Sequence, residues 1–134
     1  MSSIVRYVGL QNYDDSRGGL TVIEHGRELP FLVRRAYVIH AAKPGAERGF
    51  HAHIQLNQLM VALAGGVTLT LDDGKTREEV RLDNPRAGVL VGPGLWREMR
   101  NFTSDCVLLV LADREFEESD YIHDRAEFLR RVDR

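Results

Sequence analysis

The sequence places two histidines, His51 and His53, one residue apart in the segment Arg48–His53. Side chains two positions apart on a strand point to the same face, so both imidazoles would project into one space. Imidazole titrates near neutral pH and serves either as a general acid or base or as a ligand of a divalent metal. The pair therefore predicts a functional site, and two surface histidines on an edge strand are the alternative without function.

The spacing around the pair resembles the first signature of the cupin superfamily. Five residues separate Gly45 from His51, and Gln58 stands where a metal-binding cupin carries Glu, with six residues between Gln58 and Gly65. The later segment Pro93–Glu98 offers Glu98 where such cupins supply a further His, and Arg97 stands beside it. A metal held by His51, His53 and Glu98 is conceivable, but Gln58 removes an anionic ligand and a guanidinium competes with a cation. We therefore expect no metal and no cofactor, and two free imidazoles that act as acid–base catalysts.

The elements that must hold these residues are predicted to be short strands. Val67–Leu71 alternates apolar residues with Thr, which is the period of a half-buried strand. Asp73-Gly74, a dipeptide favoured by tight type I′ turns, follows it, and Glu79–Leu82 can return as the partner strand. Further strands are predicted at Ile4–Val8, Leu20–Glu24, Phe31–Ala41, Leu59–Ala64, Ala87–Val91 and Cys106–Leu111. Asp124–Val132 alone has a helical pattern. The predicted fold is an all-β jelly-roll barrel with a short C-terminal helix.

Length and charge exclude several classes of function. The chain has 134 residues, which predicts a single domain over residues 1–134. Its 18 basic and 20 acidic residues give a net charge of −2, so we expect no nucleic-acid partner and no membrane anchor. A single cysteine, Cys106, lies in an apolar run and is expected to be a buried, inert thiol. The lack of a disulfide framework and of a secretion-signal pattern predicts a cytoplasmic location.

The motif Arg48-Gly49-Phe50-His51-Ala52-His53 resembles the Arg-Gly-x-His-Ala-His motif of the nucleotide-sugar 3,4-ketoisomerases, the WxcM-like branch of the cupins. The likeness extends over nearly the whole chain. The other blocks similar to that family are Asp15–Leu20 with Glu24, Pro30–Phe31 with Arg35–Tyr37, Asp72–Gly74, Trp96–Met99, and Asp120–Asp124 with Phe128–Leu129. Several blocks in the correct order make the match specific.

The resemblance implies an isomerase that acts on a dTDP-linked 4-keto-6-deoxyhexose. Such an enzyme moves the carbonyl from C4 to C3 through an enediol, and its product supplies 3-amino-sugar biosynthesis. The chemistry needs a base for the proton beside the carbonyl and a group that polarises oxygen, and it needs no metal if these groups are placed in advance. The resemblance also implies a homodimer that exchanges an N-terminal strand, for which Ile4–Val8 is the expected segment. The alternative function is a metal-dependent or non-catalytic sugar-binding cupin.

Candidate roles follow for residues outside the pair. Tyr37 shares a strand face with Arg35 and Ile39. This polar pair and the family resemblance together imply that Tyr37 is catalytic and that Arg35 contacts substrate. Arg17 and Arg48 are candidates for pyrophosphate binding, because guanidinium groups contact phosphate through two hydrogen bonds. The remaining substrate-binding candidates are Gln58 and Trp96, the latter through its flat apolar face. Each has a structural alternative: a core tyrosine, solvated arginines or a core tryptophan. His40 is expected to be structural, and the acidic run Glu115–Asp120 to be a solvated loop.

Overall fold

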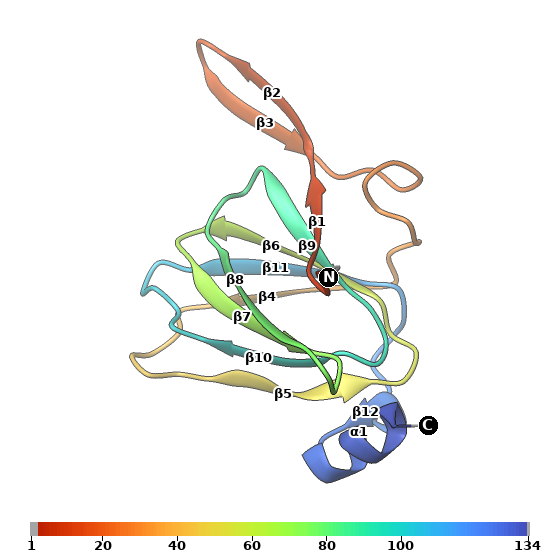
Figure 1. Cartoon of the computed structure of the whole chain (residues 1–134). Helices are drawn as coiled ribbons and strands as arrows, with labels where there is room; N and C mark the ends of the chain where they lie inside the picture. Colours follow the sequence, from red (N-terminus) through yellow and green to blue (C-terminus); the bar gives the residue numbers. More distant parts are fainter. Residues whose placement is uncertain (1–2, 134) are drawn as a thin grey trace.

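Two five-stranded antiparallel sheets face each other and enclose the apolar core (Figure 1). This computed structural model describes residues 3–133. The first sheet has the order β1 (Arg6–Gly9), β9 (Ala87–Val91), β6 (Gln58–Ala64), β11 (Val107–Ala112) and β4 (Arg35–His40). The second has the order β12 (Tyr121–Ile122), β5 (Arg48–His53), β10 (Trp96–Arg100), β7 (Val67–Asp72) and β8 (Arg77–Leu82). Apart from the β7–β8 hairpin, the neighbours in each sheet are not consecutive in sequence, as in a jelly roll, so the predicted all-β fold with a short C-terminal helix is confirmed.

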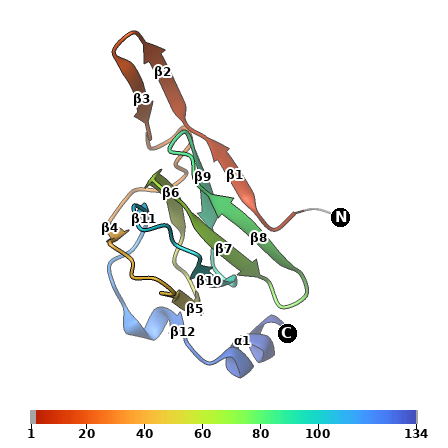
Figure 2. The ribbon, with the colours of Figure 1, turned by 90° about the vertical axis from the view of Figure 1, so that its left-hand side faces the viewer.

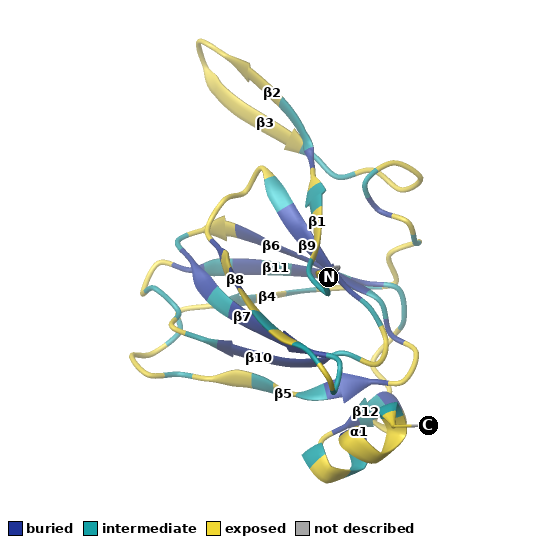
Figure 3. Ribbon diagram, in the orientation of Figure 1, coloured by how far each residue is buried: buried dark blue, intermediate teal, exposed yellow. Residues whose placement is uncertain are grey.

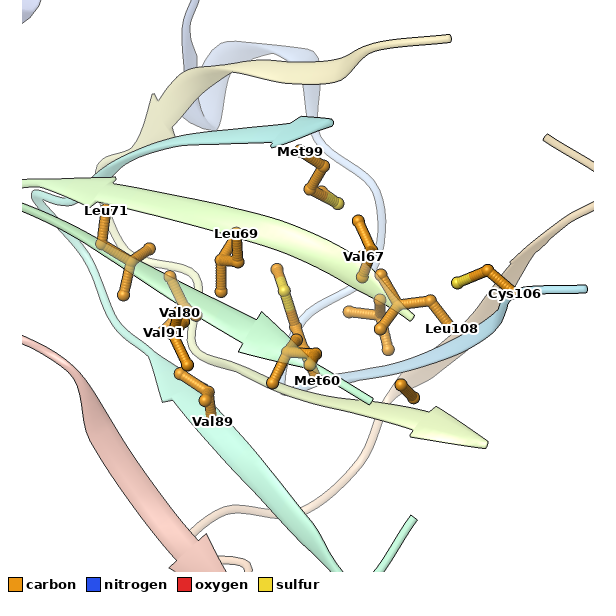
Figure 4. Packing of buried hydrophobic residues seen from close by; sticks show 13 residues of the cluster. Met60, Val67, Leu69, Leu71, Val80, Val89, Val91, Met99, Cys106 and Leu108 are labelled. Atoms are coloured by element: carbon orange, nitrogen blue, oxygen red, sulfur yellow. The ribbon is translucent and has the colours of Figure 1, made fainter. Parts of the chain in front are cut away.

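The core lies between the sheets because alternate residues of each strand point inward. Met60, Leu69, Val89 and Leu108 come from four different strands, and each is fully buried (Figure 4). Burial of an aliphatic side chain of this size stabilises the fold by about 1.5–3 kcal/mol. Cys106 packs in the same cluster, as its apolar setting predicted. The apolar interior fixes which face of every strand is available to the functional side chains.

The turn between β7 and β8 differs from its prediction. Asp72 pairs with Arg77, so four residues connect the strands and the expected two-residue type I′ turn is wrong. The side chain of Asp73 accepts hydrogen bonds from the backbone amides of Lys75 and Thr76. These side-chain hydrogen bonds pair the backbone amides of a four-residue turn. The Asp-Gly dipeptide alone does not show that the turn is longer than two residues.

The N-terminal segment divides into a docked strand and a free hairpin. Strand β1 pairs along its length with β9 of the same chain. Strands β2 (Gln11–Asp15) and β3 (Gly18–Val22) then form a separate hairpin that extends away from both sheets (Figures 1 and 2). The hairpin is almost entirely exposed, including the large side chains of Tyr13 and Leu20 (Figure 3).

The C-terminal helix α1 (Arg125–Val132) packs on the outer face of the second sheet. It begins after Asp124, whose side chain accepts a hydrogen bond from the amide of Ala126 and so caps the helix. Phe128 is fully buried against Trp96 and Ala52. The short 3-10 helix η1 (Glu118–Asp120) precedes β12. In residues 3–133, none of the helices is long and apolar enough to cross a membrane.

Candidate active site

Strand β5 brings the two histidines together on the inner side of its sheet. The ring centroids of His51 and His53 lie 4.9 Å apart in an edge-to-face arrangement. Ala52, which lies between them in sequence, points to the opposite face of the sheet and packs with Trp96 and Phe128. The period of two that the sequence suggested is therefore present, and it separates the imidazoles from the face that α1 covers.

A cavity of about 480 Å³ opens beside His51, within the range of small-molecule pockets. Its lining comprises Arg35, Tyr37, Val38, Ile39, His40, Arg48, Gly49, His51, Met99 and Tyr121. Polar side chains thus reach the cavity from both sheets, from β4 of the first sheet and from β5 and β12 of the second. His53 lies deeper, with an exposed fraction of 1%. The two histidines are therefore not equivalent, because only His51 borders the cavity.

The backbone of Gly49 fixes the tautomer of His51. The carbonyl oxygen of Gly49 lies 3.0 Å from His51 Nδ1 and accepts its hydrogen. Gly49 has a φ of +90°, and a Cβ there would lie 2.8 Å from the carbonyl oxygen of Arg97, so glycine is required. Burial, assisted by the nearby Arg97 guanidinium, lowers the pKa of His51 to about 4. At neutral pH the ring is uncharged, and its Nε2 carries a free lone pair suited to a general base.

Asp120 fixes the tautomer of His53 in the same way. Its Oδ2 lies 3.0 Å from His53 Nδ1, and its Oδ1 accepts a 2.8 Å hydrogen bond from the backbone amide of Gln55. Among residues 3–133, the buried Nε2 of His53 has no hydrogen-bond partner. Burial and the Arg97 guanidinium hold the pKa of His53 well below its usual value. The expectation that Asp120 belongs to a solvated loop is wrong, because it is buried and orients a histidine.

An aromatic side chain completes this end of the cavity. The ring of Tyr121 lies 4.9 Å from that of His51 and 4.3 Å from that of His53, measured between centroids. Its position follows from the pairing of Tyr121 with His53 across β12 and β5. Sequence reasoning assigned Tyr121 no role, although it lies in one of the blocks that carry the family resemblance.

A second polar group links the cavity to the interior. Tyr37 accepts a 3.1 Å hydrogen bond from Gln58 Nε2, and Gln58 Oε1 accepts a 2.5 Å hydrogen bond from Arg97. Arg97 is fully buried and also donates to the backbone carbonyls of Gly92 and Leu95. Burial lowers its pKa only to about 10, so it remains a cation at neutral pH. Gln58 therefore contacts protein groups on both sides, where the sequence suggested a contact with substrate.

The donor set does not fit a divalent metal. Arg97 points inward on β10, so the alternation of the strand turns Glu98 to the outer face. There the Glu98 carboxylate accepts hydrogen bonds from Trp96 Nε1, Arg77 and Arg100. The three-ligand metal site of His51, His53 and Glu98 that was considered from the sequence is therefore wrong, because Glu98 lies on the opposite face of the sheet from the histidines. Throughout the described chain, no cluster of three or more His, Cys, Asp or Glu side chains could hold a metal ion.

The same alternation corrects the interpretation of Trp96. Its ring is 3% exposed and lies 5.6 Å from the ring of Phe128, under α1. It cannot reach a ligand in the cavity, because the sheet lies between them. Trp96 is a core residue of the helix–sheet contact.

The arginine candidates divide between two locations. Arg35 and Arg48 both border the cavity, and the Arg35 guanidinium lies 5.5 Å from the centre of the Tyr37 ring. Arg17 instead lies at the exposed turn of the β2–β3 hairpin, where it pairs with Asp15. The exposed His40, expected to be structural, borders the same cavity.

Residues 3–133 match the sequence profile of the family described as FdtA: WxcM-like, C-terminal. The chain belongs to this family. It is 44% identical over 117 residues to the TDP-4-oxo-6-deoxy-alpha-D-glucose-3,4-oxoisomerase of Aneurinibacillus thermoaerophilus, which covers 87% of this chain and 84% of that protein. The FdtA family assignment confirms the resemblance carried by the His-Ala-His motif and its flanking blocks.

Solved structures agree with the FdtA family assignment. A 3,4-ketoisomerase from Helicobacter canadensis is 37% identical and superposes with a TM-score of 0.94 over 99% of this chain and 100% of that chain. A sugar 3,4-ketoisomerase from Thermoanaerobacterium thermosaccharolyticum, solved with TDP, is 34% identical with a TM-score of 0.94 over 99% and 97%. A histidine-to-asparagine variant of the latter enzyme was solved with TDP-4-keto-6-deoxyglucose, with 33% identity, a TM-score of 0.94 and coverage of 98% and 96%.

Proposed function

We propose that this chain is a nucleotide-sugar 3,4-ketoisomerase that converts dTDP-4-keto-6-deoxy-D-glucose to a dTDP-3-keto-6-deoxyhexose. The observation that carries the proposal is the placement of His51, with its Nδ1–H held by the Gly49 carbonyl, beside Tyr37 on one cavity. The relatives that share this fold act on, or bind, the same class of TDP-sugar. The proposal treats residues 1–134 as one catalytic domain.

The residues support proton transfer through an enediol. His51 Nε2 is the proposed base that takes the proton from C3, and the electron pair of that bond forms the C3–C4 double bond. Negative charge then develops on the oxygen at C4, where a hydrogen-bond donor stabilises it. The protonated imidazole returns a proton to C4 while the hydroxyl at C3 becomes the carbonyl. One proton moves from carbon to carbon and one from oxygen to oxygen, so no oxidant or reductant is consumed.

The product would carry a carbonyl at C3. That group is the substrate required by a PLP-dependent aminotransferase, so the reaction would supply the formation of 3-amino sugars. Arg35 and Arg48, which border the cavity, are the proposed contacts to the nucleotide diphosphate. A cytoplasmic location is part of the proposal and agrees with the single, unpaired Cys106.

The test is direct conversion of purified protein and dTDP-4-keto-6-deoxyglucose, followed by NMR of the sugar. We expect a 3-keto product, retained activity after treatment with a chelator, and loss of activity in His51→Asn. Binding of the nucleotide sugar without conversion would favour the sugar-binding alternative. Activity that disappears with the chelator and returns with a metal would favour the metal-dependent alternative.

We also propose that the enzyme is a homodimer that exchanges N-terminal strands. Because β1 is paired with β9 of its own chain, the exchange is better assigned to β2 and β3 than to Ile4–Val8. The side chains of this hairpin are mostly exposed to solvent, and an isolated two-stranded hairpin is only marginally stable in water. Exchange would cover it and carry Arg17 toward the partner.

Two measurements test the dimer. Light scattering should give twice the 15.2 kDa mass of one chain, and a 15.2 kDa particle at micromolar concentration contradicts the proposal. Coexpression of His51→Asn with Arg17→Ala should yield mixed dimers with activity that neither variant has alone. Arg17→Ala with full activity by itself would remove the proposed role of Arg17.

A further inference from the structure

The hydrogen bonds between Arg97, Gln58 and Tyr37 have a fixed direction. A guanidinium has no acceptor, so Gln58 must turn its carbonyl oxygen Oε1 toward Arg97. The amide nitrogen of Gln58 is then turned toward Tyr37 and donates to the hydroxyl oxygen. Since Tyr37 accepts this bond, its own hydrogen is left for another acceptor, and Tyr37 borders the cavity.

We propose that Gln58 is a positioning residue that makes Tyr37 the hydrogen-bond donor to the carbonyl oxygen of the sugar. This inference rests on the proposed ketoisomerase function and assigns the group that polarises the C4 carbonyl. Gln58 thus acts through Tyr37 and does not itself contact the substrate.

Arg97 forms the rigid end of this chain of hydrogen bonds, because it is hydrogen-bonded on several sides. Its guanidinium donates to the carbonyls of Gly92 and Leu95 as well as to Gln58, and it is fully buried. A hydrogen bond from a cation polarises the next bond in a buried chain, so the Tyr37 hydroxyl becomes a stronger donor. Burial also raises the pKa of Tyr37, and the hydroxyl therefore keeps its hydrogen at neutral pH.

The proposal explains why an amide is useful at this position. A carboxylate at residue 58 would accept from Arg97 and also from Tyr37, since it has no hydrogen to donate. The Tyr37 hydrogen would then point to residue 58 and away from the sugar. A donor placed in advance at a developing oxyanion accelerates a reaction by about 10²–10³-fold, so its loss is measurable.

The experiment compares Gln58→Glu, Tyr37→Phe and the double variant in the NMR assay of ketoisomerase activity. Gln58→Glu is close to isosteric and should lower kcat about 10²-fold or more, with little change in KM or in TDP affinity measured by calorimetry. Tyr37→Phe should lower kcat by a similar factor, and the double variant should show no further loss. Asn84→Asp adds the same charge on an exposed side chain between β8 and β9 and should keep wild-type kcat.

Three results separate the possible failures. Wild-type kcat in Gln58→Glu, or losses that multiply in the double variant, would overturn the assignment while leaving the enzyme a ketoisomerase. Absence of conversion by the wild-type protein would instead overturn the proposed function and this assignment with it. Should Gln58→Glu fail to fold, Gln58→Met removes the donor to Tyr37, and its loss of kcat should likewise vanish in a Tyr37→Phe background.

Discussion

Replacement of Asp120 by Asn should impair catalysis without removing either histidine. The carboxylate makes two hydrogen bonds, from His53 Nδ1 and from the backbone amide of Gln55, whereas an Asn side chain has one oxygen. If that oxygen stays with the amide of Gln55, the Asn nitrogen donates to Nδ1. The hydrogen of the imidazole then moves to Nε2, so His53 loses the free lone pair with which it would assist His51 in acid–base catalysis.

The size of the effect follows from these two alternatives. Loss of a positioned acid or base costs about 10²–10⁴-fold in rate, which we expect in kcat at nearly unchanged stability. If the Asn oxygen turns to His53 instead, the amide of Gln55 loses its acceptor, and the free energy of unfolding falls by about 1–3 kcal/mol. The NMR assay and urea unfolding together distinguish the two outcomes.

A matched control, Asp113, lies seven positions earlier in the chain. Asp113 accepts hydrogen bonds from the backbone amide and the side chain of Asn57, but contacts no histidine. Asp113→Asn should therefore change stability by a comparable amount and leave kcat within a few-fold of wild type. An Asp120→Asn protein with both wild-type kcat and wild-type stability would refute the reasoning on His53.

Three further predictions concern the histidines and the helix. His51→Asn and His53→Asn should each lower kcat about 10²–10⁴-fold in the NMR assay while the circular dichroism spectrum is retained, and wild-type turnover in both would contradict acid–base catalysis. The pKa of His51 is about 4 in the folded state and about 6.5 in the unfolded state, so the unfolded state takes up a proton at a higher pH. The free energy of unfolding should therefore fall by about 3 kcal/mol as the pH drops from about 6.5 to about 4. Urea midpoints at about pH 7.5 and about pH 5 should therefore differ less in His51→Asn than in wild type, and equal pH dependence would remove the assignment. Phe128→Ala should lower the free energy of unfolding by about 3–5 kcal/mol in the same assay, because it empties a buried contact with Trp96, and a change below about 1 kcal/mol would show that α1 is not docked there.

Much of the fold was predictable because apolar residues alternate clearly along the core strands. Leu59–Ala64, Ala87–Val91 and Val67–Leu71 were predicted as strands, and β6, β9 and β7 follow those bounds to within one residue. Strand β10 escaped prediction because Arg97 and Glu98 are charged, which usually indicates exposure. Both are buried. Arg97 donates a hydrogen bond to Gln58 of β6 in the facing sheet, Glu98 accepts one from Arg77 of β8, and these bonds compensate for the lost solvation.

The candidate site was only partly predictable for a related reason. The His-x-His spacing is local, so the strand period alone places His51 beside His53. The partners that orient the site are distant in sequence, since Asp120 lies 67 positions after His53 and Arg97 lies 39 positions after Gln58. Such pairs depend on which strands become neighbours, and a single sequence does not specify that order.

The central claim is that neutral imidazoles move a proton between C3 and C4 of the sugar, and isomerisation in D₂O tests it most directly. The proton taken from C3 resides on an imidazole that can exchange with solvent before C4 is protonated. NMR of the 3-keto product should therefore show deuterium at C4, with some of the original hydrogen retained if one base serves both carbons. A product that carries only the migrated hydrogen at C4, with no deuterium from solvent, would contradict the acid–base mechanism.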